Sequence, residues 1–518
     1  MDRDEMLGKI ADSTAVWDFI IIGGGATGVG VAVEAISRGY QVLLLEQQDF
    51  ASGTSSRSTK LIHGGVRYLQ QGNVSLVLEA LKERGKLRRN APHLVHDLPF
   101  IVPIYDWWEG PFYGIGLKVY DMLAGKEGFG HSENLSKKET LEQIPTVETK
   151  GLRGGVIYHD GQFDDARLVI NLAQTAAAQG AALINYMKVK KLVKKDGLVS
   201  GVIACDLENG KEYELKSRAV INATGVFSDR IRQLDDPLAS PFIKPSQGIH
   251  IVLEKSFLPG ETAIMVPHTD DGRVLFAIPW HDRVVVGTTD TPVKEISMTP
   301  VPMAEEIDFL LKHAARYLSK DPEPGDVLSV FAGLRPLVSN TENLNTATIS
   351  REHTISISRT GLVTIAGGKW TTYRKMAEET IDQAIEIAQL ENHPSVSENL
   401  QIHGYHNHAR KFGSIAVYGS DALEIEKMVE KKPALGEKLS DGITLPAEVL
   451  WAVEHEMART VEDFLARRRR TLFLDARAAM DMAPDVAKLM NSKLKKGRKW
   501  QKTQVESFRK TATGYLVH

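Results

Sequence analysis

The chain has 518 residues, of which 42% are hydrophobic and 25% are charged, and its formal net charge is −3 at pH 7. This length exceeds one ordinary hydrophobic core, so we expect two or three domains, and the near-neutral charge gives no support for nucleic-acid binding. The single cysteine, Cys205, excludes an internal disulfide framework and a cysteine-based metal cluster, and it fits a reducing compartment.

The chain begins with a polar segment, residues 1–15, which we interpret as a leader without the apolar core of a secretory signal peptide. An apolar run at 19–22 then meets a glycine-rich turn, a small-residue helix pattern follows to residue 36, and a second apolar run spans 42–45. Strand, glycine turn, helix and strand in this order are typical of a dinucleotide-binding unit.

Each glycine of that turn has its own function in such a unit. Gly23 allows the tight turn, Gly25 lets the backbone approach a pyrophosphate, and Gly28 lets the helix pack on the strand. The N-terminus of the helix presents free N–H groups and the positive end of its dipole to the phosphates. Glu46 ends the second apolar run, where a carboxylate accepts hydrogen bonds from a ribose diol. The chain is therefore predicted to bind an adenine dinucleotide.

The following part of the chain alternates between helical and strand patterns. Residues 74–89 and 166–179 are predicted helices, and an aromatic-rich segment at 99–122 lies between them. Residues 182–193 and 201–215 alternate in the manner of strands in a meander.

Two further strand-and-turn patterns occur at 219–225 and 361–368, and a predicted helix at 370–388 follows the second. Residues 247–290 alternate strongly and indicate an antiparallel sheet, whereas helical patterns dominate after residue 390. Segments typical of nucleotide binding thus occur near the N-terminus, in the middle of the chain and again at 361–368, with predicted sheet segments between them. A discontinuous domain of this kind favours a flavin-dependent oxidoreductase over a plain NAD dehydrogenase.

Eight further peptides carry a resemblance to a known family. They are SSRSTKLIHGGVRYL at 55–69, DGQFDDAR at 160–167, ATG at 223–225, GIH at 248–250, PW at 279–280, GTTD at 287–290, GLRP at 333–336 and GGKWTTYR at 367–374. In this order they resemble the FAD-dependent glycerol-3-phosphate dehydrogenases of the bacterial respiratory and mitochondrial type. The resemblance is close from residue 17 to 390, and the C-terminal part matches that family's helical cap domain only loosely.

The resemblance implies FAD as cofactor and oxidation of sn-glycerol 3-phosphate to dihydroxyacetone phosphate, with hydride passing to flavin N5 and electrons to a quinone. It also implies an α/β fold, α+β overall, with a Rossmann-like FAD-binding domain, an inserted antiparallel-sheet substrate domain and a helical C-terminal cap. We place the FAD-binding domain at 16–95, 150–245 and 330–390, the substrate domain at 96–149 and 246–329, and the cap at 391–518.

Candidate phosphate-binding residues lie in two of these segments. The paired glycines Gly64 and Gly65 let backbone lie against a flat ring, and the following Arg67 and Tyr68 are suited to bind a phosphate dianion. By the resemblance, Arg351 binds the phosphate together with Arg67.

Three side chains are candidates for the chemical step. His250 lies on an alternating strand, and alcohol oxidation needs a proton acceptor of near-neutral pKa. The resemblance places His250 at the reacting hydroxyl and Arg335 near the carbinol, where a guanidinium stabilises alkoxide charge. Lys369 follows a glycine pair at a predicted helix start and is suited to hold the substrate and stabilise reduced flavin. We favour His250 as the general base, with Arg335 and Lys369 able to tune or share this role.

The remaining predicted FAD contacts come from polar loops and glycine turns. The loop after Glu46 offers hydroxyls and N–H groups for the pyrophosphate, and the turn after the middle strand is the second expected contact. These residues are Thr54, Ser55, Ser56, Ala223, Thr224, Gly225 and Gly368. No histidine or carboxylate cluster has metal-ligand spacing, and no calcium loop of the EF-hand type is present, so we predict no metal.

Three rival functions are kept open. The first is a glycerol-3-phosphate oxidase that uses oxygen, although the short segment 291–330 lacks the insertion of such oxidases and favours a quinone. The second is an FAD-dependent dehydrogenase of another small hydroxy or amine substrate. The third is a dinucleotide-binding sensor without turnover, against which the convergence of basic side chains argues.

Membrane contact, if it occurs, is expected to be peripheral, at the inner face of the cell membrane in a cytoplasmic protein. The apolar stretch 99–124 contains four charged residues and cannot span a bilayer. A candidate interfacial surface comprises Trp107, Trp108, Phe112, Tyr113 and Lys118, and the basic stretches 467–470 and 493–502 could add attraction to anionic lipid. A homodimer is kept open.

Overall fold

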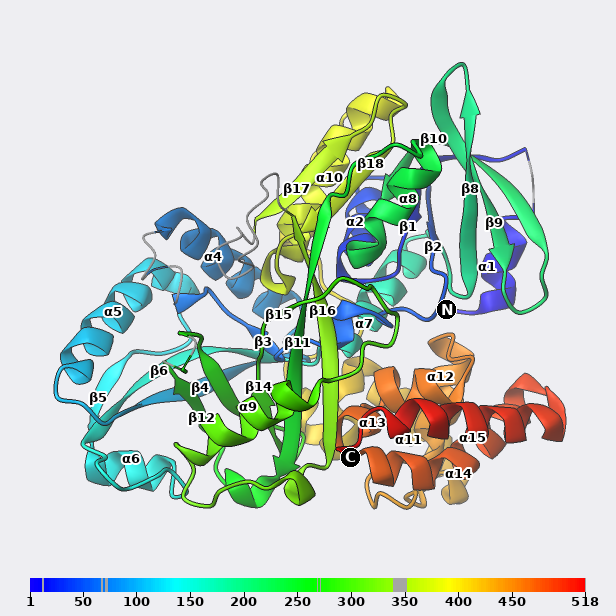
Figure 1. The fold of residues 1–518 in the computed structure, drawn as a ribbon. Helices are drawn as coiled ribbons and strands as arrows, with labels where there is room; N and C mark the ends of the chain where they lie inside the picture. The colour runs from blue at the N-terminus through cyan, green and yellow to red at the C-terminus, as the bar shows by residue number, and fades with distance from the viewer. Residues whose placement is uncertain are drawn as a thin grey trace.

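The computed structural model describes residues 1–11, 14–66, 69, 73–267, 269–270, 272–338 and 352–517. Two sheets and a helical C-terminal region make up the molecule (Figure 1). The first sheet and its helices form the upper right of that view, the second sheet lies at the lower left, and the C-terminal helices lie at the lower right.

The first sheet has the strand order β17-β18-β10-β1-β2-β7, with β8 and β9 continuing from β10. Its strands are β1 (Val16–Ile22), β2 (Val42–Leu45), β7 (Ala182–Ile184), β8 (Met187–Lys195), β9 (Leu198–Asp206), β10 (Glu212–Asn222), β17 (His353–Ile357) and β18 (Val363–Gly367). The centre is parallel, because β1 pairs in parallel with both β2 and β10, and β10 pairs in parallel with β18.

Continuous apolar runs form these central strands because both faces of the sheet are covered. Residues 19–22 and 42–45 are fully buried. Helix α2 (Ala26–Ser37) packs against α7 (Asp165–Ala178) and α10 (Tyr373–Ala388). Gly30 permits the second contact, since a Cβ there would lie 2.8 Å from Cδ2 of Tyr373.

The second sheet has the order β15-β11-β14-β13-β12-β4-β6-β3, with β16 beside β11 and β5 beside β6. Its strands are β3 (Leu61–Ile62), β4 (Val95–Ile104), β5 (Glu133–Ser136), β6 (Gly154–Phe163), β11 (Ile243–Glu254), β12 (Ala263–Val266), β13 (Leu275–Trp280), β14 (Arg283–Gly287), β15 (Thr291–Pro292) and β16 (Ser329–Val338). Ile249, Ile251 and Leu253 of β11 pack with Leu310 and Leu311 of α9 (Ala304–Ala315). The alternate residues, His250 among them, therefore face the other side of the sheet.

The C-terminal region, residues 391–517, is helical and packs against the second sheet through the shared core that joins Val252 and Phe331 to Met482 and Phe508. Its helices are α11 (Ala422–Lys431), α12 (Pro446–His455), a π-helical turn (Asp463–Arg468), α13 (Thr471–Leu474), α14 (Ala476–Leu494) and α15 (Gly497–Thr513). The other helices are α1 (Arg3–Lys9), α4 (Val74–Asn90), α5 (Glu109–Ala124), α6 (Lys137–Gln143) and α8 (Ser228–Asp235).

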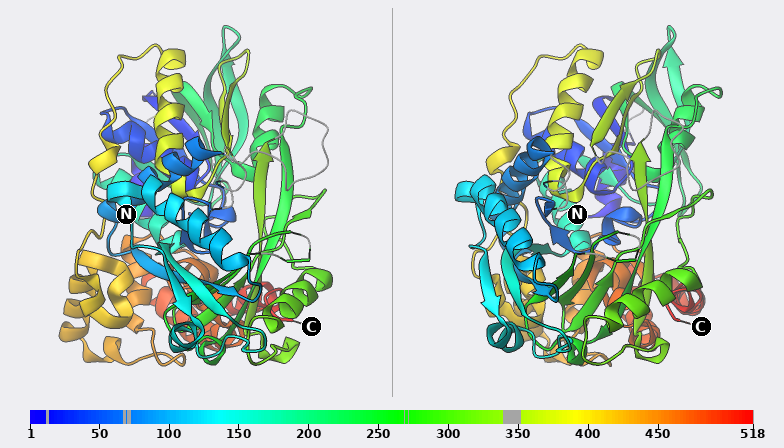
Figure 2. Two further views of the ribbon diagram at one scale, coloured as in Figure 1. Left: turned by 90° about the vertical axis from the view of Figure 1, so that its left-hand side faces the viewer. Right: turned by 60° about the vertical axis from the view of Figure 1, so that its left-hand side comes forward.

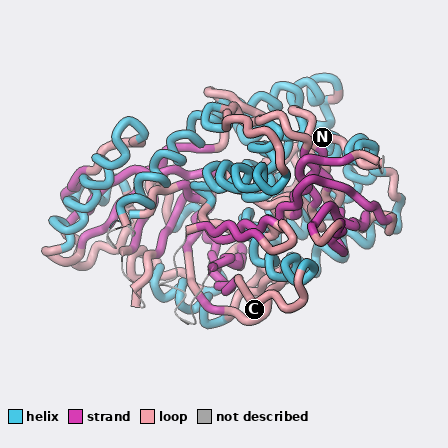
Figure 3. The backbone as a smooth tube through the Cα atoms, turned by 90° about the horizontal axis from the view of Figure 1, so that it is seen from above, coloured by secondary structure: helices cyan, strands magenta, loops and turns pink. Residues whose placement is uncertain are grey.

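Helices α4 and α5 lie side by side at one end of the molecule (Figure 2). Seen from above, α5 again lies at the outer edge, at the end remote from the first sheet (Figure 3). Within the described ranges, no helix combines the length and the apolar character needed to cross a membrane.

The predicted α/β class and the order of the elements are confirmed, but the sheets divide the chain differently from the proposed domain boundaries. Strands β6 and β16, placed with the FAD-binding segments from sequence, belong to the second sheet, because β6 pairs with β4 along its whole length and β16 pairs with β11 over ten residues. Within the predicted leader, Arg3–Lys9 form helix α1, and Arg3 anchors this helix through a contact of its guanidinium with Asp206 at 2.7 Å.

Candidate active site

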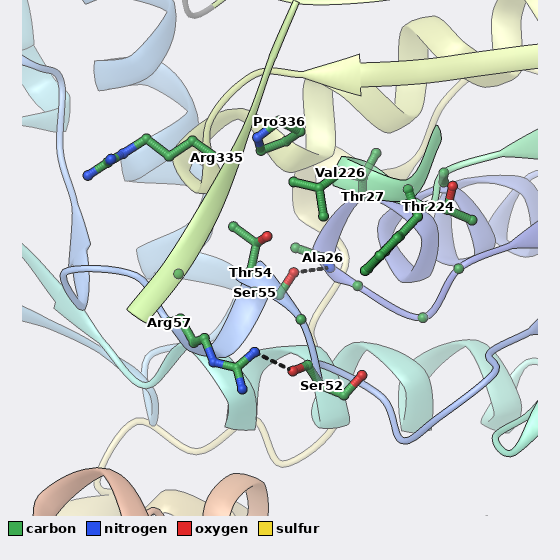
Figure 4. A pocket seen from close by; sticks show the side chains of 18 of the residues that line it. Ala26, Thr27, Ser52, Thr54, Ser55, Arg57, Thr224, Val226, Arg335 and Pro336 are labelled. Atoms are coloured by element: carbon green, nitrogen blue, oxygen red, sulfur yellow. Dashed lines mark hydrogen bonds between the residues drawn. The ribbon is translucent and has the colours of Figure 1, made fainter. Parts of the chain in front are cut away.

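A cavity of about 690 Å³ lies between the two sheets. The loops that follow β1, β2, β10 and β18 line one part of it, and strands β11 and β16 line the other. Figure 4 shows that the loop of residues 52–57 contributes side chains between these two parts, opposite Thr224 and Val226. We call the first part the dinucleotide end of the cavity and the second part the reaction end.

The glycine turn at the dinucleotide end is shaped by backbone contacts. Gly23 has a φ of +113°, and a Cβ there would lie 2.6 Å from the carbonyl oxygen of Ala223. A Cβ on Gly28 would lie 2.0 Å from the carbonyl oxygen of Gly23. The two glycines thus let the first turn of α2 and the end of β10 lie close to the glycine turn. This close packing leaves the room that a pyrophosphate needs.

Hydrogen bonds fix the loops around this turn. The Ser55 hydroxyl accepts the N–H of Ala26 at 2.9 Å, in the first turn of α2 (Figure 4). Glu46 accepts the N–H of Gly24 at 2.6 Å and that of Gln48 at 2.7 Å. Burial raises the pKa of the Glu46 carboxyl. The carboxylate therefore sits where the sequence predicted it, at the end of β2 and facing the cavity.

Most of the predicted cofactor residues line the cavity. These are Gly23, Gly25, Glu46, Thr54, Ser55, Ala223, Thr224, Gly225 and Gly368. Four predicted residues do not line it: Gly28, Ser56, Gly64 and Gly65. Gly28 acts through packing. Gly64 donates its N–H to the Tyr120 hydroxyl at 2.8 Å, where a Cβ would lie only 2.5 Å from that oxygen.

His250 lies at the reaction end, on β11, and is only 2% exposed. Its Nε2 is 3.0 Å from Oγ1 of Thr59, and its ring stacks on Phe331 with a centroid distance of 4.9 Å. Gly287 makes room for the ring, since a Cβ there would lie 2.1 Å from Cδ2 of His250. Burial, and then the positive charges of Lys60 and Arg335, hold the pKa of His250 well below its usual range.

Arg335 reaches the same end of the cavity from β16. Its Nη2 donates to Oγ1 of Thr288 at 3.0 Å and to the carbonyl oxygen of Thr289 at 2.9 Å, and its Nη1 donates to Asp290 at 3.2 Å. Gly248 leaves space for the guanidinium, because a Cβ there would lie 2.3 Å from Nη2. Since the fixed geometry costs no reorganisation, this cation is well placed to stabilise developing negative charge.

Lys369 also lines the cavity, directly after the glycine pair that ends β18. The structure thus brings His250, Arg335 and Lys369 to one cavity from three separate strands or strand ends. Arg67, Tyr68 and Arg351, the predicted phosphate-binding residues, lie outside the described residues.

Sequence reasoning missed the partners of His250. Thr59 and Lys60 lie within the peptide at 55–69 but were not singled out, and Phe331 and Gly287 gave no signal of their own. Their roles come from strand pairing, which sets Gly287 and Phe331 opposite His250. In the described part of the chain, no group of three or more His, Cys, Asp or Glu side chains could hold a metal ion.

The basic stretch at 467–470 is not a lipid-facing surface, and that prediction is wrong. Arg467 and Arg468 bind the buried carboxylate of Asp49, which follows β2. Arg470 is 1% exposed and contacts Asp165 at 3.0 Å. These arginines instead join the C-terminal region to the first sheet.

The residues that line the cavity fit FAD. A glycine turn without room for side chains, the N-terminus of α2 and a buried carboxylate at the end of β2 form the expected adenosine and pyrophosphate site. Bound there, the cofactor would be held by the backbone of 23–25, by Glu46 and by the turn 223–225.

Comparison with known proteins agrees with this geometry. Residues 18–374 match the family model described as FAD dependent oxidoreductase, and residues 358–504 match that of the C-terminal domain of alpha-glycerophosphate oxidase. The chain is 40% identical to the mitochondrial glycerol-3-phosphate dehydrogenase of Mus musculus, over 98% of this chain and 74% of that protein. It is 38% identical to that of Schizosaccharomyces pombe, over 99% of this chain and 89% of that protein.

A solved structure is similar along nearly the whole chain. It is the glycerol-3-phosphate dehydrogenase of Bacillus halodurans in complex with FAD, with a TM-score of 0.80, 30% identity, and coverage of 99% of this chain and 97% of that one. The L-alpha-glycerophosphate oxidase of Mycoplasma pneumoniae with FAD bound shares the fold at a TM-score of 0.57 and 17% identity, over 74% of this chain and 98% of that one.

Proposed function

This chain belongs to the family of FAD-dependent glycerol-3-phosphate dehydrogenases, and from that premise we propose how its residues perform the reaction. The reaction is the FAD-dependent oxidation of sn-glycerol 3-phosphate to dihydroxyacetone phosphate. FAD, when bound, accepts the hydride at flavin N5. The protein must therefore bind the phosphate, hold the carbinol carbon and accept the hydroxyl proton.

His250 is the proposed proton acceptor. Its lowered pKa keeps the ring unprotonated at neutral pH, so a nitrogen lone pair is available when substrate binds. Thr59, stacking on Phe331 and the absence of a side chain at Gly287 fix the orientation of the ring. The position of this ring at the reaction end of the cavity, whose other end is lined by the glycine turn, is the observation that supports the assignment.

Four cationic side chains are proposed to bind the negative charge of the substrate. Arg335 stabilises the alkoxide as the proton leaves, because Thr288, Thr289 and Asp290 already hold its guanidinium in place. Lys369, which lines the cavity directly after β18, holds the substrate. Arg67, Tyr68 and Arg351 bind the phosphate, as their residue types indicate.

An anaerobic spectral titration of the FAD-loaded enzyme tests this function. We expect sn-glycerol 3-phosphate to bleach the visible flavin band, whereas glycerol, which lacks the phosphate, leaves it unchanged at the same concentration. A band that persists with glycerol 3-phosphate would remove the substrate assignment. Bleaching by an amine or a simple hydroxy acid would favour the rival dehydrogenase.

The electron acceptor is proposed to be a quinone. Under anaerobic conditions, a short-chain ubiquinone should restore the flavin band of the reduced enzyme. In air, the reduced enzyme should release little hydrogen peroxide. Rapid, stoichiometric peroxide formation would instead identify an oxidase.

The outer face of α5 is proposed to rest in the interface of the membrane that contains this quinone, at the inner face of the cell membrane. Helix α5 is apolar on two sides. Tyr113, Leu117 and Tyr120 are buried against the protein, so Tyr113 is not part of the surface as predicted. The opposite side exposes Phe112, Ile115 (68%), Val119 and Met122 (80%), and Trp107 (76%) and Trp108, which directly precede the helix, are exposed as well.

Several observations favour lipid over a protein partner on this face. A helix with a second apolar side, aromatic residues at one end and Lys118 exposed on it is typical of interfacial helices. The face lies at the outer end of the molecule, away from the C-terminal region, in Figures 1 and 3. The basic residues 493–502 lie at the end of α14, in the link to α15 and at the start of α15, at the other side of Figure 1, and so are not part of this surface.

Vesicle co-sedimentation of a Trp107→Ser, Ile115→Ser, Met122→Ser variant tests the surface. We expect it to lose most of its binding to vesicles while its activity with a soluble acceptor stays unchanged. Leu238→Ser, at a position that is 90% exposed elsewhere, is the matched control and should bind as the wild type does. Unchanged vesicle binding combined with a shift from dimer to monomer in gel filtration would assign the face to a homodimer.

A further inference from the structure

We propose that the C-terminal region positions the active-site histidine, with Arg470 holding the turn that sets Thr59 against His250. The inference rests on the proposed function, in which His250 accepts the substrate proton. It gives the C-terminal region a part in the reaction. Arg470 does not touch the reacting atoms and is therefore a positioning residue.

The turn of residues 56–60 is held from inside by one carboxylate. Asp165, at the start of α7, accepts the N–H of Ser58 at 3.1 Å and its hydroxyl at 2.7 Å. The same carboxylate binds the ammonium group of Lys60 at 2.7 Å, and that ammonium also donates to the carbonyl oxygen of Ser56 at 2.8 Å. Thr59, between Ser58 and Lys60, then has its hydroxyl at 3.0 Å from His250.

Arg470 closes this network from the C-terminal region. Its Nη2 donates to the carbonyl oxygen of Ser56 at 2.7 Å and to Asp165 at 3.0 Å, and its Nη1 donates to the carbonyl oxygen of Ala466 at 2.9 Å. The Arg470 guanidinium therefore connects the C-terminal region to the Ser56 carbonyl and to the Asp165 carboxylate, the two acceptors that hold the turn. Its side chain is 1% exposed and those of Lys60 and Asp165 are not exposed at all, so these contacts are shielded from solvent.

Aromatic rings surround the side chains of Lys60 and Arg470 and connect them to His250 through a second set of contacts. The Lys60 ammonium lies 5.2 Å from the ring centre of Trp280, 5.1 Å from that of Phe331 and 5.4 Å from that of Phe473. The Arg470 guanidinium lies 4.3 Å from the ring centre of Phe473. Phe331 is the ring on which His250 stacks, so a displaced turn would disturb both contacts of the histidine.

The backbone at Arg470 supports a role beyond packing. Its φ is +72°, a region that side-chain-bearing residues seldom adopt. Strained conformations of this kind persist where the surroundings hold them and are frequent at functional sites. The strain also provides a clean test, because glycine adopts this conformation without cost and removes the guanidinium at the same time.

The test compares Arg470→Gly with Thr59→Val by rapid-reaction anaerobic reduction of the FAD-loaded enzymes. We expect each variant to slow flavin reduction about 10- to 100-fold, as a small misplacement of a reacting group does. The FAD content and the dissociation constant for glycerol 3-phosphate should stay within about twofold of the wild type. Because Arg470 acts on His250 through the turn that carries Thr59, the effects of the two substitutions should be less than additive, and the double variant should be no slower than the slower single variant.

Two further variants separate positioning from general loss of structure. Arg470→Lys keeps the charge and one of the two donor directions, so it should recover part of the rate. Arg469→Met is the matched control, since Arg469 bonds only within the C-terminal region, to Ser414, Thr444 and Glu448 among the described residues. It should reduce at the wild-type rate.

Each outcome decides the proposal. A folded, FAD-loaded R470G variant that reduces at the wild-type rate overturns it, and so do additive effects of R470G and T59V. If R470G does not retain FAD, the same cycle is run with R470K, where additivity again overturns the proposal. A wild-type flavin that glycerol 3-phosphate does not bleach would instead reject the proposed function, which is a separate result.

Discussion

The two ends of the cavity are built in different ways. The dinucleotide end is made largely by one contiguous stretch, residues 22–55, and much of its shape comes from backbone groups and from glycines that leave room for them. The reaction end is made by side chains from β11, β16 and the loop after β14, together with a turn that the C-terminal region holds. A site of backbone groups can be encoded locally, whereas a site of converging side chains needs the whole fold.

This contrast predicts that substitutions at the two ends have separable effects. Changes at the reaction end should slow the flavin reduction step and leave FAD bound. Changes at the dinucleotide end should weaken FAD binding and leave the reduction step intact once FAD is saturating. A substitution with both effects would show that the two ends are coupled.

The largest effect is expected at His250. Replacing it by asparagine keeps the approximate size of the side chain and removes the proton acceptor, so flavin reduction should slow by about 10²- to 10⁴-fold with unchanged FAD content. Stopped-flow absorbance under anaerobic conditions measures the rate. His406→Asn, in the C-terminal region and outside the cavity, is the control. A rate near that of the wild type would assign the base to another residue.

The next effect is expected at Arg335. Arg335→Met removes a preoriented cation and should slow reduction by about 10²- to 10³-fold. Arg335 is also one cause of the lowered pKa of His250, so its removal should raise that pKa. Because a protonated histidine cannot accept a proton, the loss of activity on acidification should begin at a higher pH in the variant.

The pH dependence of kcat/KM for wild type and R335M measures this shift. The second ionisation of the substrate phosphate affects both enzymes equally and cancels in their ratio. The ratio of variant to wild-type activity should therefore fall as the pH is lowered through the raised pKa. A ratio that is constant with pH would show that Arg335 does not influence the base.

A smaller effect is expected at Glu46, at the other end of the cavity. Glu46→Gln keeps the shape but replaces a charged acceptor by a neutral one, which should weaken FAD binding by about 10- to 100-fold. Equilibrium dialysis or fluorescence titration of the apoenzyme measures the affinity. At saturating FAD, the reduction rate should equal that of the wild type, and a slower rate would contradict the separation of the two ends.

The predicted elements agree with the structure where a local pattern was strong. Residues 74–89 and 166–179 were predicted as helices, and the structure has helices at Val74–Asn90 and Asp165–Ala178. Residues 182–193 were predicted as one strand of a meander, but Tyr186 has a positive φ and separates a parallel strand from an antiparallel one. A periodicity of two does not distinguish between these two kinds of strand.

The sequence by itself determined the dinucleotide unit, because this unit depends on residue types at fixed spacing along a short stretch. It also indicated the FAD cofactor and the family, through the resemblance of eight peptides between residues 55 and 374. It also placed His250, Arg335 and Lys369 among the candidates, although through resemblance and not through spacing. Only the tertiary structure decided that Thr59, Phe331 and Gly287 surround His250, and that residues 467–470 are buried ion-pair partners and not a basic surface. The physical reason is that burial and pairing are properties of segments that meet in the folded chain, and a charge run has the same pattern in sequence whether it is solvated or enclosed.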